Sequence, residues 1–393
     1  MHQNLFILAF FSFLYGLVSK KMDASYLSGP IIFVLFGLLV GPYGLGFLDI
    51  EIDAELISSL AEFTLALVLF TDASMMKAKF VRKNIKTPRR LLFIGLPLTI
   101  GFGFVFAIVL FTEFLWIEAL ILAVILAPTD AALGKPVVNN TGVPNKIRQS
   151  LNVESGLNDG ICVPILLVCF AMSTQTTDGS EILWHVYFVK TIGIGILVGT
   201  GLTFLGTYLM RQAIKWGFAS ETWNRMIAIT LSLSIFLLAE VLGGSGFIAC
   251  FSGGAIFGVL VRQNKLRYEI AAEGVGDIMS LATWVVFGAV VVGRFFVEVN
   301  LMMIIYAVLS LTIIRMVPVS FSLSGLKVKR KERLFIGWFG PRGLASIVFV
   351  VMALQQNLPH IKTISMIAVG TILLSIVAHG LSANPLINKY FKS

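Results

Sequence analysis

The sequence predicts an all-α polytopic membrane protein, with about 13 transmembrane helices arranged as two inverted repeats of six and a linker helix. Hydrophobic residues make up 57% of the 393 residues and charged residues only 13%, whereas soluble domains carry about 25% charged residues. Apolar runs of about 20 residues recur along the whole chain, which is the length that a spanning helix needs. These runs are continuous rather than alternating, and this favours helices over a β-barrel.

Thirteen apolar segments account for this predicted count. The first has Lys20 and Lys21 after it and no Lys or Arg before it, so it is predicted to be a span rather than a cleaved signal peptide. The seventh is the predicted linker between the two repeats. In chain order, the predicted spans cover residues 5–19, 27–45, 55–76, 91–112, 116–137, 150–173, 186–210, 223–242, 244–261, 272–293, 299–322, 333–355 and 362–383.

The charges in the loops predict the orientation. Basic residues gather in the loops after odd-numbered spans, such as 77–90 and 327–333, and acids gather in the opposite loops, such as 49–55. The positive-inside rule then puts the N-terminus outside and the C-terminus in the cytoplasm. The same loops account for the net charge of +9, so no nucleic-acid partner is predicted. No loop is long enough for a soluble regulatory domain, and no phosphate-loop motif suggests an ATP-driven pump.

Two of the apolar segments are interrupted by proline in a polar setting. The fifth contains Ala127-Pro128-Thr129-Asp130 and the twelfth contains Gly340-Pro341-Arg342-Gly343. Proline lacks an N–H and clashes with the preceding turn, so each motif predicts a broken helix. The breaks lie seven spans apart, one with an acid and one with a base, as expected for corresponding positions of inverted repeats. A simple kink with Asp130 as a cap is the alternative for the first motif.

The sixth segment carries two acids in the stretch Asn152-Val153-Glu154-Ser155-Gly156-Leu157-Asn158-Asp159-Gly160. At about 100° per residue, Ser155 and Asp159 share one helix face, while Glu154 points roughly 140° away from Asp159. The two acids should therefore have different partners. Ionisable residues at membrane depth are costly and usually functional, which makes both of them candidate site residues.

A count of the deep charges suggests how they are compensated. Arg315 lies in an apolar run with no acid nearby in its own segment, so its partner must come from another helix. If Glu154 pairs with Arg315, and Arg342 and the half-helix dipoles compensate Asp130, the count assigns no base to Asp159. A buried carboxylate in such a setting takes up a proton unless a cation replaces it.

These residues predict a site at which a cation and a proton compete. The Asp159 carboxylate, the Ser155 hydroxyl and the hydroxyl or carbonyl of Thr129 are hard oxygen ligands, which suit Na⁺ or Li⁺. Asn158 can hydrogen-bond there but adds no second titratable charge, so exchange of one cation for one proton without net charge is expected. No cofactor and no enzymatic reaction are predicted, and the ions Na⁺ (or Li⁺ or K⁺) and H⁺ are the expected cargo.

On these motifs the chain resembles the NhaP-type sodium–proton antiporters, bacterial relatives of the sodium–hydrogen exchangers, over essentially the whole membrane unit. The resemblance implies that Asp159 binds the ion, with Thr129, Ser155 and Asp130 around it. It also implies a structural Glu154–Arg315 ion pair, and Arg342 balancing the crossing of two broken helices. In that family an Asn-Asp pair marks the electroneutral branch, and Asn158-Asp159 is such a pair. The motifs that carry the resemblance most specifically are Ala127-Pro128-Thr129-Asp130-Ala131-Ala132-Leu133-Gly134, the Asn152–Gly160 stretch and Gly340-Pro341-Arg342-Gly343.

The resemblance further implies a homodimer in a bacterial inner membrane, in contact with lipid, that works by alternating access with an elevator-like movement. Gly37–Gly41 and Gly254–Gly258 are GxxxG pairs at matching places in the two halves and predict close helix packing. The implied division assigns scaffold and dimer contacts to residues 1–90 (spans 1–3) and 216–296 (spans 8–10), the ion-carrying core to 91–174 (spans 4–6) and 297–393 (spans 11–13 and a short tail), and the linker span to 175–215.

Other functions fit the sequence less well. An intramembrane aspartyl protease needs two facing carboxylates that share a proton, and the settings of Asp130 and Asp159 lack its usual motif. A channel would need a filter-like sequence. A sodium-coupled organic anion symporter with the same inverted repeats would need a further basic or polar pocket. A K⁺/H⁺ antiporter of the same family is the nearest alternative.

Overall fold

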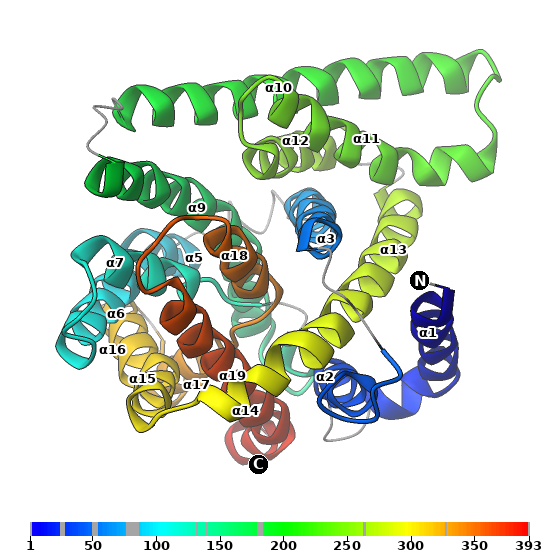
Figure 1. The fold of residues 1–393 in the computed structure, drawn as a ribbon. Coiled ribbons are helices and arrows are strands. Elements are labelled where there is room, and N and C mark those ends of the chain that lie inside the picture. The colour runs from blue at the N-terminus through cyan, green and yellow to red at the C-terminus, as the bar shows by residue number, and fades with distance from the viewer. Residues whose placement is uncertain are drawn as a thin grey trace. The chain divides into compact units, whose positions relative to one another are not determined.

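The computed structural model describes residues 2–23, 28–48, 54–75, 86–130, 133–138, 140–178, 184–261, 265–326 and 328–391 (Figure 1). Every regular element in these ranges is a helix. In chain order they are α1 (His2–Asp23), α2 (Gly29–Val40), α3 (Ala54–Met75), α5 (Lys86–Arg90), the π-helical η1 (Leu91–Gly95), α6 (Leu96–Leu110), α7 (Trp116–Ile125), α8 (Lys135–Val138), α9 (Asn145–Asp178), α10 (Trp184–Lys215), α11 (Glu221–Val241), α12 (Gly246–Leu260), α13 (Lys265–Val286), the π-helical η2 (Phe287–Val292), α14 (Gly293–Glu298), α15 (Leu301–Leu311), α16 (Ile313–Ser322), α17 (Arg330–Trp338), α18 (Leu344–Leu354) and α19 (Ile361–Phe391).

The helices confirm the predicted class of an all-helical, multi-pass membrane protein. Among the described residues, eight helices are long and apolar enough to cross a membrane. Shorter apolar helices include α7 and α18, which are the halves next to the predicted breaks. Helical residues occur in every predicted span, and the basic loop residues at 76–85 and the motif residues Ala131 and Ala132 lie outside the described ranges.

Both predicted breaks are present. α7 ends at Ile125, and no helix forms from Ala127 to Asp130, so the fifth predicted span is not one continuous helix. α17 ends at Trp338, and a non-helical segment (residues 339–343) leads into α18. In each case the proline removes a backbone donor at the point where the helix stops.

The contacts divide the chain into two compact units. One comprises Met1–Ser59, Asn84–Asn158 and Leu281–Ser393, and the other comprises Leu60–Lys83 and Asp159–Ser280. The helix α9 therefore contributes its residues up to Asn158 to the first unit and the rest to the second. The scaffold and core segments expected from the sequence are a functional division, and they stay a prediction.

In the first unit, the glycine pair of α2 packs against η2 and the end of α13. A Cβ on Gly37 would overlap the carbonyl oxygen of Val285, and a Cβ on Gly41 would lie 2.7 Å from the Cα of Ala289. The two backbones can approach this closely only because neither glycine has a side chain. The predicted close packing at this pair is confirmed, with a helix of the same chain as its partner.

In the second unit, the glycine pair of α12 packs against α3 in the same manner. A Cβ on Gly254 would overlap the carbonyl oxygen of Phe70, and a Cβ on Gly258 would overlap that of Ser74. The helices α10 and α12 also lie side by side (Figure 1). Close backbone contacts of this kind are typical of helices packed in membranes.

Candidate functional site

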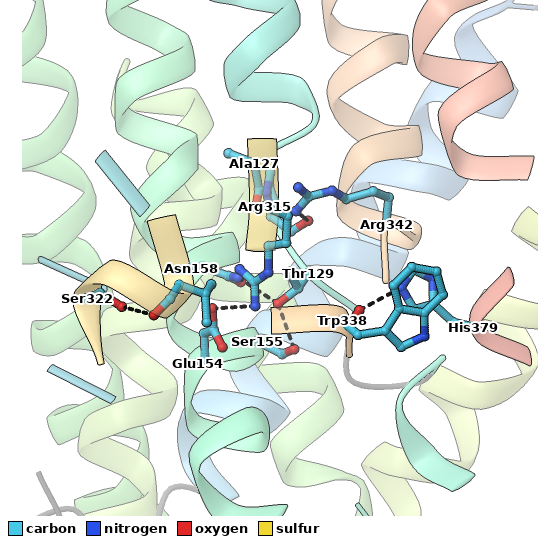
Figure 2. A network of polar contacts seen from close by, with 12 residues as sticks. Ala127, Thr129, Glu154, Ser155, Asn158, Arg315, Ser322, Trp338, Arg342 and His379 are labelled. Carbon is cyan, nitrogen blue, oxygen red and sulfur yellow. Dashed lines mark hydrogen bonds and ion pairs between the residues drawn. The ribbon is translucent and has the colours of Figure 1, made fainter. Parts of the chain in front are cut away.

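The two broken helices meet through their backbones. The amide of Asp130 donates a hydrogen bond to the carbonyl of Pro341, with 2.7 Å between N and O. In the other direction, Nη1 of Arg342 donates to the carbonyls of Ala127 at 2.7 Å and Pro128 at 3.0 Å (Figure 2). The last carbonyls of a helix have no partner within the helix, and here the opposite break supplies donors to the backbone just after α7.

The side chain of Asp130 serves the opposite helix in turn. Its Oδ2 accepts from the amide of Leu344, the first residue of α18, at 2.8 Å, and its Oδ1 accepts from Leu133 N at 3.2 Å. A carboxylate at a helix N-terminus and a guanidinium near a helix C-terminus both oppose the helix dipole. Asp130 and Arg342 are both buried. At the crossing, the acid of the first break compensates the start of α18, and the base of the second break compensates the carbonyls just after α7.

The two glycines of the second break make this crossing sterically possible. A Cβ on Gly343 would overlap Oδ2 of Asp130, and a Cβ on Gly340 would lie against the guanidinium of Arg315, 2.6 Å from its Cζ. These two positions therefore need glycine because a side chain has no space there.

Three polar side chains gather beside the first break. Oγ1 of Thr129 lies 3.0 Å from Oγ of Ser155, and Nδ2 of Asn158 donates to the same Oγ1 at 2.8 Å. All three residues are buried. Oδ1 of Asn158 finds no hydrogen-bond partner among the described residues. Figure 2 shows the three side chains directed toward one another, Thr129 from the break and the other two from α9.

Asp159 is also buried, at 7% exposure. It follows Asn158 on α9 and stands four residues after Ser155, so one face of the helix carries Ser155 and Asp159. The predicted group of ion-binding residues comprised Thr129, Asp130, Ser155, Asn158 and Asp159. The structure brings Thr129, Ser155 and Asn158 into direct contact, and α9 carries Asp159 within one turn of Ser155. The oxygens of Asp130, next to Thr129, accept from the backbone amides of Leu344 and Leu133.

Glu154 makes the ion pair with Arg315 that the resemblance implied. Its Oε1 lies 2.7 Å from Nη2 of Arg315, and the two side chains are 4% and 3% exposed (Figure 2). Arg315 lies three residues after Thr312, the non-helical residue that separates α15 from α16. The pair joins α9 to α16, and its guanidinium also lies against Gly340.

Sequence reasoning missed two residues that contact the second break. Nε2 of His379 lies 2.8 Å from the carbonyl of Trp338, and Oγ of Ser375 accepts from Arg342 N at 2.7 Å. Both belong to α19. A histidine within a long apolar segment was the available signal, because an ionisable group at that depth calls for a partner.

The described residues contain no group of three or more His, Cys, Asp or Glu side chains placed to hold a metal ion. Cys162, Cys169 and Cys250 are buried and free, as expected of small core residues.

Interrupted helices that face each other with their ends compensated by charged side chains define a class of protein, the secondary transporters. The family model described as sodium/hydrogen exchanger, transmembrane, matches residues 7–389. The chain belongs to this family, which is one of transporters and not of enzymes.

Individual relatives agree with this assignment. The K(+)/H(+) antiporter NhaP2 of Shewanella sp. (strain ANA-3) is 24% identical over 380 residues, which cover 96% of this chain and 64% of that protein. The Na(+)/H(+) antiporter NhaG of Bacillus atrophaeus is 28% identical over 286 residues, 69% of this chain and 52% of that protein. The chain thus spans less than two thirds of the length of these relatives.

A solved structure shows the same fold. The sodium proton antiporter MjNhaP1 from Methanocaldococcus jannaschii superimposes with a TM-score of 0.77 at 21% sequence identity, covering 96% of this chain and 99% of that one. At this identity the similarity concerns the fold alone.

Proposed function

We propose that the chain is an antiporter that exchanges a monovalent cation for a proton by alternating access. The observation that carries the proposal is the buried contact of Thr129, Ser155 and Asn158 at the break, one turn from Asp159. Membership of the sodium/hydrogen exchanger family supports it. The carboxylate of Asp159 holds the proton in one half of the cycle and the cation in the other.

The neighbouring oxygens supply the remaining ligands. The hydroxyls of Thr129 and Ser155, 3.0 Å apart, and the open Oδ1 of Asn158 are hard donors of the kind that bind Na⁺, Li⁺ or K⁺. The amide of Asn158 holds Thr129 in place and does not titrate. One carboxylate with one exchangeable charge gives a stoichiometry of one cation per proton, without net charge movement.

The contacts of Asp130 favour a supporting role beside these ligands. Its two oxygens accept backbone amides at 2.8 and 3.2 Å, which holds the break in position next to Thr129. Arg342 balances the other end of the crossing, and the Glu154–Arg315 pair fixes α9 against α16. We assign these four residues to the architecture of the site and Asp159 to the exchange itself.

Na⁺, with Li⁺ as a substitute, is the proposed cation, and K⁺ is the second candidate. The second candidate rests on the relatives, because NhaP2 of Shewanella is named a K(+)/H(+) antiporter and NhaG of Bacillus atrophaeus a Na(+)/H(+) antiporter. Hydroxyl and amide oxygens are compatible with either ion, so ligand type does not separate them.

The proposed topology has 13 spans in two inverted repeats of six, with the N-terminus outside and the C-terminus in the cytoplasm of a bacterial inner membrane. Helix packing supports the repeats. Spans 2 and 9 correspond under an offset of seven, as do spans 3 and 10. The α2 glycines pack on span 10 and the α12 glycines pack on span 3, which is the same pair of contacts with the repeats exchanged. We also propose a homodimer built on the scaffold spans.

Proteoliposomes with a pH-sensitive dye test the proposed function. Addition of Na⁺, Li⁺ or K⁺ in turn should release protons with at least one of the three, and Asp159→Asn should abolish the response. Glu221→Gln, at a largely exposed carboxylate, serves as the control and should exchange normally. A wild-type protein that moves no protons with any cation, or an Asp159→Asn variant with the wild-type rate, would sink the proposal.

A further inference from the structure

One turn of α19 contacts the break in the twelfth span at two places. Just before the break, Nε2 of His379 contacts the carbonyl of Trp338, the last residue of α17, at 2.8 Å. Within the non-helical segment 339–343, Oγ of Ser375 accepts from Arg342 N at 2.7 Å. Ser375 is fully buried and His379 is 2% exposed. The two positions are four residues apart, so they lie on one face of the helix.

Polar contacts link Ser375 and His379 to each other as well as to the break. A carbonyl can only accept, so Nε2 of His379 donates to Trp338. The amide of Arg342 donates to Oγ of Ser375. Nδ1 of His379 lies 3.1 Å from that Oγ and 2.8 Å from the carbonyl oxygen of Ser375. The contacts thus run from Arg342 N through Ser375 and the ring of His379 to the carbonyl of Trp338.

The break held by α19 continues directly to the cation ligands. Arg342 donates to the carbonyls of Ala127 and Pro128, and Pro341 accepts from the amide of Asp130. Thr129 lies between these anchored residues and contacts Ser155. A shift of the segment 339–343 is thus passed to Thr129 through hydrogen bonds on both sides of it.

We propose that Ser375 and His379 are positioning residues, which hold the second break and, through it, place the Thr129 oxygen for cation binding. The proposal rests on the proposed function. Packing also contributes, since the rings of His379 and Trp338 lie 5.0 Å apart. Ser375→Ala removes the hydroxyl alone and leaves this packing in place, so it is the sharper variant.

The experiment measures cation-dependent proton release from proteoliposomes over a range of cation concentrations. The cation is whichever of Na⁺, Li⁺ and K⁺ the wild-type protein exchanges. The midpoint of thermal unfolding is measured for each variant as well. Ser365→Ala is the matched control, because Ser365 is a buried serine of the same helix whose hydroxyl bonds Ile361 O in its own turn. Ser375→Ala should raise the apparent KM for the cation about fivefold relative to this control, as the loss of one hydrogen bond predicts. The maximal rates of the two variants should agree, and the thermal midpoint shows that Ser375→Ala is folded.

An apparent KM of Ser375→Ala within twofold of Ser365→Ala overturns the proposal, whatever happens to the maximal rate. If Ser375→Ala does not fold, His379→Gln decides by the same comparison, since it can keep a donor toward Trp338 and loses the contacts of Nδ1 with Ser375. Failure of the proposed function is distinct, because the wild-type protein itself would then release no protons with any of the three cations.

Discussion

The Glu154–Arg315 pair shows how a single contact depends on its surroundings. Both side chains are almost completely buried and their charged atoms are 2.7 Å apart. Removal of one charge would leave the other without compensation in the interior, and the cost of that exceeds the value of the pair itself. The pair is therefore expected to matter more for folding than for exchange.

Glu154→Gln should lower the free energy of unfolding by about 3–5 kcal/mol, because Arg315 would remain buried without its carboxylate. Thermal melting of the detergent-solubilised protein measures the loss. The control is Glu221→Gln, which weakens an exposed pair with Arg225 at 3.9 Å and should change stability by less than about 1 kcal/mol. Equal midpoints for the two variants would refute the structural role of Glu154.

Competition at Asp159 gives a second expectation at this scale. If one carboxylate holds either a proton or the cation, acidification raises the apparent KM for the cation and leaves the maximal rate at saturating cation unchanged. In the acidic limit each unit of pH should raise the apparent KM about tenfold. Concentration series at several pH values measure this. A constant KM with a falling maximal rate would mean that the proton acts elsewhere.

The sequence predicted several residue contacts because charge is costly in lipid. Arg315 has no acid nearby in its own segment, so a partner from another helix was required, and the distance to Glu154 meets that requirement. The sequence did not predict the contact of Ser375 with the second break, because a serine in an apolar helix usually hydrogen-bonds the backbone of its own helix. Its contact with the amide of Arg342 depends on tertiary structure alone.

At the scale of elements, the crossing of the two breaks joins segments that are far apart in the chain. The prolines predicted both breaks, since each removes a backbone donor in the middle of an apolar run. The fifth span was predicted to reach residue 137, whereas α7 ends at Ile125. Hydropathy does not reveal this end, because a non-helical segment has the same hydropathy as a helical segment of the same residues. The π-helical turns η1 and η2 were not predicted either, since a shift of one residue leaves an all-apolar pattern unchanged.

Gly343→Ala tests the crossing. The added Cβ would overlap Oδ2 of Asp130, so either the carboxylate or the break must move, at a cost of about 1–3 kcal/mol and with a strongly reduced exchange rate. Gly101→Ala is the control, since a Cβ on Gly101 has open space around it in α6. Thermal melting and dye-reported exchange compare the two. Gly343→Ala with the exchange rate of Gly101→Ala would contradict the described contact.

For the whole molecule, the helical membrane class followed from composition, because so apolar a chain cannot bury its surface in water. The division into two compact units could not be predicted from composition, since it depends on which helices contact each other. The boundary after Asn158 falls within α9, a single helix of 34 residues, and hydropathy has no feature there. The oligomeric state is likewise a property of surfaces that the sequence pattern does not resolve.

Electroneutral exchange is an expectation for the whole molecule. Since Asn158 does not titrate and Asp159 carries one exchangeable charge, one cation should replace one proton. Transport on solid-supported membranes should therefore give no current when a cation gradient is applied, while a dye reports proton movement under the same conditions. A cation-dependent current from the wild-type protein that is lost in Asp159→Asn would exclude a stoichiometry of one to one.

The crossing also imposes an order on synthesis. The donor from Arg342 to the carbonyl of Ala127 lies 215 residues later in the chain, which corresponds to about 10–40 s of translation. Until Arg342 is made, the backbone after α7 lacks this donor. The first break therefore cannot reach its final form by itself, and a chain that stops before Gly340 is expected to be a substrate for quality control rather than a half-sized transporter.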